Sequence, residues 1–254
     1  MKYFILLLLP WIAGGCAFIL ARLQWSEPLI YPWPLLAALV VHVIAIAWIG
    51  WRRLSLREVA EKMSPSVIAM AVFGASFLLI ENTIIRWIVT FLFAGLSVLT
   101  LKLYFLLCYD RQRYPVNALS HVNLALVPLI MFFLGWVLDG LAVFIRLPWW
   151  IAVCVSAVIV ATIYVVTSHP TAERMHRIRW TILGAFIGVQ IGVLTQVLPG
   201  GMMVQGALAA LLVAAPLRVR RYAYQPVPPT RVAWGEACMG VTMFLAILLL
   251  SRWA

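Results

Sequence analysis

Three ionisable side chains lie inside long apolar runs of this sequence, namely His42, Lys102 and Asp139. An ionisable group in the hydrocarbon of a bilayer costs at least about 2.5 kcal/mol, so each is by default a candidate functional residue. Lys102 has a long stem that can carry its ammonium group to the membrane surface, so we set it aside. Asp139, which Gly140 follows, is the strongest candidate. His42 is either a proton relay or ligand, or a neutral imidazole bonded to a neighbouring helix.

Other polar residues at the expected outer side of the membrane could join Asp139. Arg146 follows Asp139 by about two helical turns, while Glu81 and Arg86 flank the turn after another apolar run. The candidate polar membrane site therefore comprises Asp139, Glu81, Arg86, Arg146 and, nearer the midplane, His42. Since aromatic anchors and ion pairs are common at membrane surfaces, interfacial anchoring is the alternative interpretation.

Sequence motifs for soluble-type catalysis are missing. The chain has no HExxH, GxSxG or Walker A motif and no paired carboxylates within its apolar runs. Several His and acidic residues share basic loops, but their spacing matches no strong metal motif; they are His121, His169, His176, Asp110 and Glu173. The four cysteines are scattered without a CxxC pair. We therefore predict no metal site and can assign no cofactor.

The elements that must position these residues are membrane-spanning helices. Hydrophobic residues make up 65% of the chain and charged residues 11%, against roughly 45–50% and about 25% in soluble domains. The apolar runs are close to the length that crosses about 30 Å of hydrocarbon. We predict an all-α, polytopic transmembrane helical bundle of about nine spans, forming one integral membrane domain over residues 1–254. The predicted spans are 3–23, 29–50, 65–80, 87–108, 120–144, 149–167, 180–198, 202–217 and 232–250.

Two segments between these spans have their own patterns. Residues 51–63 carry charge with apolar residues at helical spacing, which predicts a short amphipathic helix in the interface. Ser64 and Pro65 then form a typical helix start, with a capping residue followed by proline. Residues 218–231 are basic and rich in proline, which predicts an extended cytoplasmic linker.

The distribution of positive charge sets the expected orientation. If the N-terminus is cytoplasmic, most of the 19 Lys and Arg residues fall on the cytoplasmic side, as the positive-inside rule requires. The basic residues left outside are Arg22, Arg86, Arg146 and Arg252. We expect a prokaryotic cytoplasmic (inner) cell membrane, with the C-terminus outside. We then expect the basic residues behind the net charge of +11 to contact anionic lipid headgroups at the cytoplasmic face. Nucleic acid is not an expected partner.

Small residues at regular spacing predict one close helix pair. The GxxxG-type stripe consists of Gly184, Gly188 and Gly192. Its expected counterpart consists of Gly206, Ala210 and Ala214. Because small residues let helix backbones approach closely in lipid, we expect spans 180–198 and 202–217 to pack as antiparallel neighbours. The alternative is that the glycine stripe mediates dimerisation.

Three functional hypotheses follow from this sequence. The leading expectation is a non-catalytic subunit, assembly factor or scaffold of a membrane complex, with other subunits or further copies of itself as partners. The alternative is a small transporter or channel with a site around Asp139. A weaker one is a membrane enzyme that acts on a lipid through His121 or His176. With no catalytic motif visible, the sequence favours a protein that is not an enzyme.

Overall fold

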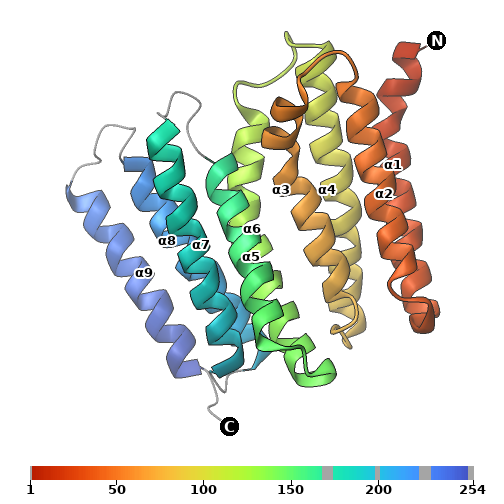
Figure 1. Cartoon of the computed structure of the whole chain (residues 1–254). Coiled ribbons are helices and arrows are strands. Elements are labelled where there is room, and N and C mark those ends of the chain that lie inside the picture. The colour runs from red at the N-terminus through yellow and green to blue at the C-terminus, as the bar shows by residue number, and fades with distance from the viewer. Residues whose placement is uncertain (1, 168–173, 198–200, 223–229, 251–254) are drawn as a thin grey trace. The chain divides into compact units, whose positions relative to one another are not determined.

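The structure, a computed structural model, describes residues 2–167, 174–197, 201–222 and 230–250 (Figure 1). Within these ranges the chain forms nine α-helices and one short 3-10 helix, and no strand. The chain divides into two compact units, Met1–Leu126 and Val127–Ala254. Each unit is described by itself below.

The first unit is built from four long helices. Its elements are α1 (Lys2–Ser26), η1 (Pro28–Ile30), α2 (Trp33–Gly50), α3 (Leu56–Ser76), α4 (Thr83–Tyr109) and the start of α5 (Ala118–Ile145). The four helices run in alternating directions (Figure 1), and α1 packs against both α2 and α4 while α3 contacts α2 and α4. The predicted polar turn before α4 supplies its N-cap, since the Asn82 side chain accepts hydrogen bonds from the amides of Ile84 and Ile85 at 2.9 and 3.2 Å.

The second unit contains the rest of α5 and four further helices. These are α6 (Trp149–Val166), α7 (Arg174–Val197), α8 (Met202–Tyr222) and α9 (Thr230–Leu250). The helix α7 packs along α6 and also contacts α8, and α8 contacts α9. The predicted linker 218–231 is only partly described, because residues 223–229 lie outside the described ranges.

Within the described residues, seven helices are long and apolar enough to cross a membrane. They are Phe4–Ser26, Trp33–Gly50, Thr83–Tyr109, Ala118–Ile145, Trp149–Val166, Met175–Val197 and Met202–Val219. The chain is therefore an all-α, multi-pass membrane protein, as the sequence predicts. The other two predicted spans fall in α3, whose first half is charged, and in α9, whose apolar part is the shorter segment Cys238–Ile247.

One predicted helix boundary is wrong. The sequence places a helix start at Ser64 and Pro65, but α3 begins at Leu56 and continues through Pro65. Proline has no N–H and disrupts the hydrogen bonds of the preceding turn. Asn123 of α5 donates a hydrogen bond of 2.8 Å to the Lys62 carbonyl in that turn, so a side chain from another helix supports the backbone there. The amphipathic and apolar segments are thus one helix.

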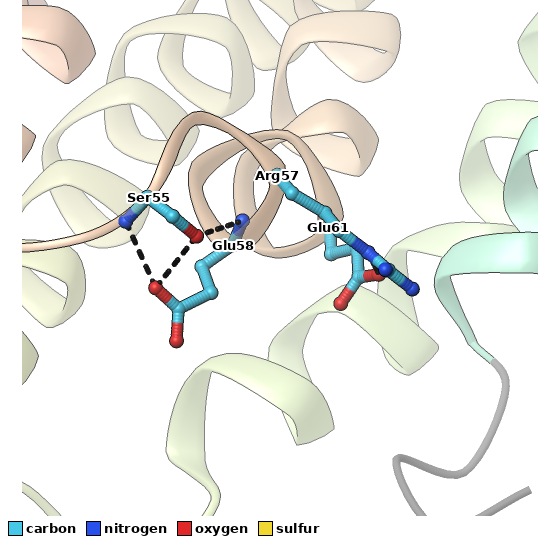
Figure 2. A network of polar contacts seen from close by, with 4 residues as sticks. All are labelled: Ser55, Arg57, Glu58 and Glu61. Carbon is cyan, nitrogen blue, oxygen red and sulfur yellow. Dashed lines mark hydrogen bonds and ion pairs between the residues drawn. The ribbon is translucent and has the colours of Figure 1, made fainter.

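The true start of α3 is a capping box (Figure 2). The Ser55 hydroxyl oxygen accepts a hydrogen bond from the Glu58 amide at 3.3 Å. In return, the Glu58 carboxylate accepts bonds of 2.9 Å from the Ser55 amide and hydroxyl. These two bonds, the backbone one first, hold the pKa of Glu58 below its ordinary value. The next turn carries an exposed ion pair between Arg57 and Glu61 at 3.0 Å.

The glycine stripe of α7 packs against α6. A Cβ built on Gly188 would lie 2.5 Å from the Ser156 carbonyl oxygen, and one on Gly192 would lie 2.5 Å from the Val153 Cα. Only glycine permits such an approach of two backbones. The contact is reinforced by the Ser156 hydroxyl, which donates a 2.7 Å hydrogen bond to the Gly188 carbonyl. Gly184 meets a side chain instead, because a Cβ built on it would lie 2.8 Å from Cγ of Tyr164.

The helices α7 and α8 are neighbours, as predicted, but the expected packing of the glycine stripe against α8 is wrong. On α8, Gly206 faces the Phe132 carbonyl of α5, and Gly135 of α5 in turn faces Gly206. Ala210 and Ala214, the other two small residues of that pattern, are half-buried. The physical reason is that α6 also carries small residues on its buried face, including Ala152 and Ser156, and it accepts the α7 glycines closely.

Gly188→Ala should destabilise the protein by about 1–3 kcal/mol, because its methyl group would force α6 and α7 apart. The measurement is thermal or SDS unfolding in detergent, followed by circular dichroism. Gly240→Ala in α9 is the matched control, because a Cβ there meets nothing within 4 Å. Equal unfolding of Gly188→Ala and wild type would contradict the close packing.

Ser55→Ala should lower stability by about 1 kcal/mol at neutral pH through loss of the α3 cap. Because the pKa of Glu58 is lowered in the folded protein, its contribution is present above the ordinary value of 4.5 and is lost as the pH falls below the shifted value. The stability difference between wild type and variant should therefore shrink in acid. The control is Arg57→Gln, whose exposed ion pair contributes about 0–1 kcal/mol; a pH-independent difference would rule out the Glu58 contribution.

Candidate functional site

His42 lies at the centre of a small polar cluster between three helices. Its side chain is fully buried in α2, with Nδ1 at 2.9 Å from the Ser97 hydroxyl of α4 and Nε2 at 3.3 Å from the Ser66 hydroxyl of α3. Ser66 donates its own proton to the Met63 carbonyl at 2.9 Å. It therefore accepts from Nε2–H, and in a neutral imidazole Nδ1 then accepts from Ser97. The ring thus joins two neighbouring helices through both nitrogens, the contact expected in the second of the two alternatives for His42.

The other candidates of the first unit lie at a helix turn. Arg86 of α4 donates from Nε to the carbonyl of Ile80, the residue that ends the turn after α3. Glu81 is exposed, and no hydrogen bond or ion pair joins it to Arg86 within the described residues. Arg86 thus links the end of α3 to the start of α4, and Glu81 is accessible at the same turn.

Asp139 is buried in α5, with 7% of its surface exposed. It has no hydrogen bond or ion pair within the part of the chain that the structure describes. Arg146, its expected neighbour, is exposed beyond the end of α5 with a positive φ of 53°. No ion pair joins these two residues, so the carboxyl group of Asp139 is without a charge partner among the described residues.

Trp136 lies one helical turn from Asp139 on the same face of α5. The indole N–H of this tryptophan is buried and finds no acceptor among the described residues. Its ring belongs to an aromatic cluster, with centroids 5.7 Å from Phe132 and 6.0 Å from Phe133. Asp139 and Trp136 therefore present an acceptor and a donor on one buried helix face, beside aromatic rings.

The predicted five-residue site is divided between the two units. His42, Glu81 and Arg86 belong to the first unit, and Asp139 and Arg146 to the second. Sequence reasoning missed Ser66 and Ser97 as partners of His42, although a serine within an apolar run is a detectable signal. Lys102, which we set aside, lies with its ammonium nitrogen 5.8 Å from the ring centroid of Trp11, a cation–π contact between α4 and α1.

The loop residues considered for metal or lipid chemistry are dispersed. Asp110 pairs with Arg113 at 3.5 Å, His176 accepts a hydrogen bond from the Trp180 indole, and His121 is exposed. His169 and Glu173 lie outside the described residues. Within the described ranges no group of three or more His, Cys, Asp or Glu side chains could hold a metal ion.

Comparison of the chain with models of known protein families, with curated proteins and with solved structures finds no match. The chemistry of the buried residues is therefore the basis on which function is proposed.

His42→Leu should destabilise the first unit by about 1–3 kcal/mol, because it buries the Ser97 hydroxyl without its imidazole acceptor. The measurement is unfolding in detergent, followed by circular dichroism. Thr162→Val is the control, since this hydroxyl bonds only to the Val158 carbonyl of its own helix. Unchanged stability of His42→Leu would contradict a structural role for the His42 cluster.

Proposed function

We propose that this protein is a small membrane transporter that binds a monovalent cation, H⁺ included, at Asp139 of α5. The observation that supports the proposal is the burial of this carboxyl group without a partner among the described residues. A carboxylate in hydrocarbon is stable only when a cation or a proton neutralises it. A cation that arrives, binds and leaves supplies that charge and is the transported species.

Trp136 gives the proposed site a second function. Aromatic faces attract cations, and the unpartnered indole N–H can donate to a water molecule or a hydroxyl group that accompanies the cation. Phe132 and Phe133 pack against the Trp136 ring and limit its rotamers. In this proposal Asp139 binds the charge, and Trp136 orients the bound species.

Asp139→Asn should abolish transport with little change in fold, because the amide has similar size and no charge. The purified protein is reconstituted in liposomes, and charge displacement is recorded on a solid-supported membrane after jumps of H⁺, Na⁺, K⁺ or methylammonium. We expect a transient current with at least one of these cations and a decrease of at least about tenfold in the variant.

Asp110→Asn is the matched control, because it changes a carboxylate that pairs with Arg113 outside the predicted spans. This variant should keep the wild-type current. Equal currents in wild type and Asp139→Asn, or no current with any of the four cations, would contradict the transporter proposal.

The subunit or scaffold hypothesis is a second candidate because of α9. Among its residues whose side chains are described, none is fully buried, and a Cβ built on Gly235 or Gly240 would meet nothing within 4 Å. Such glycines can accept another helix closely. Native mass spectrometry of the protein extracted in mild detergent tests this role. Partner chains lost on Gly240→Leu would support it, and an unaccompanied protein would contradict it.

We also propose the cytoplasmic membrane of a prokaryote as the location, with the N-terminus inside. The support lies in the first unit, where the α2–α3 and α4–α5 connections lie at the same end as the start of α1 (Figure 1). These two connections contain Arg52, Arg53, Arg111 and Arg113. Reporter fusions to the α2–α3 and α3–α4 connections test this orientation. A cytoplasmic signal is expected only from the first.

A further inference from the structure

Arg22, near the end of α1, is held by aromatic rings. Its guanidinium carbon lies 4.9 Å from the ring centroid of Trp25 and 4.9 Å from that of Trp87 on α4. The two indole rings meet edge to face, with centroids 5.0 Å apart. A guanidinium has five N–H donors, and no hydrogen bond or ion pair of Arg22 is formed within the described residues. The rings therefore position the cation and leave its donors available.

The depth of Arg22 suits a lipid headgroup. Arg22 is exposed and lies about one turn, or roughly 6 Å, from the end of α1. Tryptophans concentrate at this level of a bilayer, where acyl chains meet headgroups. Glu27, the acid that follows α1, is exposed and forms no ion pair with Arg22. No described residue therefore supplies an anion that pairs with the Arg22 guanidinium at this depth, so a pairing anion comes from elsewhere.

An apolar seam between α1 and α4 continues inward from Arg22. Phe18 of α1 packs against Trp87 and Phe91 of α4, with centroids 6.2 and 5.5 Å away. One turn deeper, Gly15 and Gly95 are exposed, and a Cβ built on either would meet nothing within 4 Å. The α1–α4 seam therefore carries aromatic rings below Arg22 and then two exposed glycines, against which a hydrocarbon chain can lie.

Neighbouring cations differ from Arg22. Arg86 donates to the Ile80 carbonyl, so part of its guanidinium is used within the protein. Lys102 lies over Trp11, but its ammonium has no planar fork for phosphate. Arg22 alone among these three combines a guanidinium without protein acceptors, two indole rings and an apolar seam beneath.

We propose that Arg22, with Trp25 and Trp87, binds the phosphate group of an anionic phospholipid whose acyl chain lies along the α1–α4 seam. Guanidinium and phosphate match in charge and in the paired geometry of their hydrogen bonds. The two rings reduce the rotamer freedom that Arg22 would otherwise lose on binding. The site belongs to the first unit and is independent of the transport proposal for Asp139.

The test is native mass spectrometry of the full-length protein in detergent, titrated with phosphatidylglycerol or, separately, with phosphatidylcholine. Wild type should retain one phosphatidylglycerol more tightly than the rest. Arg22→Gln should weaken that retention about tenfold, and Arg22→Lys should weaken it less because the charge remains. Arg146→Gln is the control, because this exposed arginine has no aromatic ring over its guanidinium among the described contacts.

Gly95→Leu tests the seam while leaving Arg22 intact. The added side chain enters open space, so folding is preserved, and phosphatidylglycerol retention should fall by at least about twofold. Circular dichroism verifies that each variant is folded.

Three results would overturn the proposal. Retention by Arg22→Gln equal to that of wild type would show that Arg22 does not bind the lipid. Equal retention of phosphatidylcholine would show that the site does not select an anionic lipid. Displacement of phosphatidylglycerol by inorganic phosphate at similar concentration would show that the ligand is a free anion.

Discussion

The absence of water in the hydrocarbon core constrains every polar group of this protein. Backbone groups satisfy the constraint through helices. Hydroxyl side chains bond to carbonyls of their own helix, as in Thr100 and Thr162, and a few polar side chains bond to neighbouring helices. Ser156 donates across the interface to the Gly188 carbonyl, and His42 is bonded on both ring nitrogens by serines from two other helices. Asn123 donates to the backbone of α3 in the turn before Pro65. Much of the helix packing therefore coincides with the pairing of polar groups.

Asp139 and Trp136 are among the residues that do not follow this pattern, as are Trp25 and Ser64. Asp139 is a buried residue that carries a carboxyl group and Trp136 has a buried N–H donor, and neither group has a hydrogen-bond or ion-pair partner among the described residues. The simplest physical explanation for these two polar groups is that their partner is not part of the folded chain and binds during function. A transported cation is one such partner. Arg22, at the membrane boundary, also has hydrogen-bond donors without an acceptor among the described residues, and a lipid phosphate can be that acceptor.

The sequence predicts the helices well because long apolar runs have few alternatives in a bilayer. The sequence also predicts which ionisable residues, such as His42 and Asp139, lie within the membrane spans. The sequence does not predict which helices these residues contact. The glycine stripe is an example: it predicts a close helix contact but does not identify the helix that makes it. Gly188 accordingly meets α6 and not the predicted α8. The start of α3 was misplaced because Ser64 and Pro65 resemble a cap, while the capping box at Ser55 depends on Glu58 three residues later.

The central claim, that Asp139 is a buried carboxyl group that binds a transported cation, is tested most directly by labelling with a hydrophobic carbodiimide. This reagent enters the membrane and reacts with protonated carboxyl groups there. Peptide mass spectrometry should locate an adduct on Asp139. If Na⁺, K⁺ or methylammonium produces the current in liposomes, that cation should protect Asp139 from reaction; if H⁺ produces it, labelling should increase as the pH falls. An unlabelled Asp139 in a sample where other carboxyl groups react, or labelling that neither these cations nor pH change, would contradict the claim.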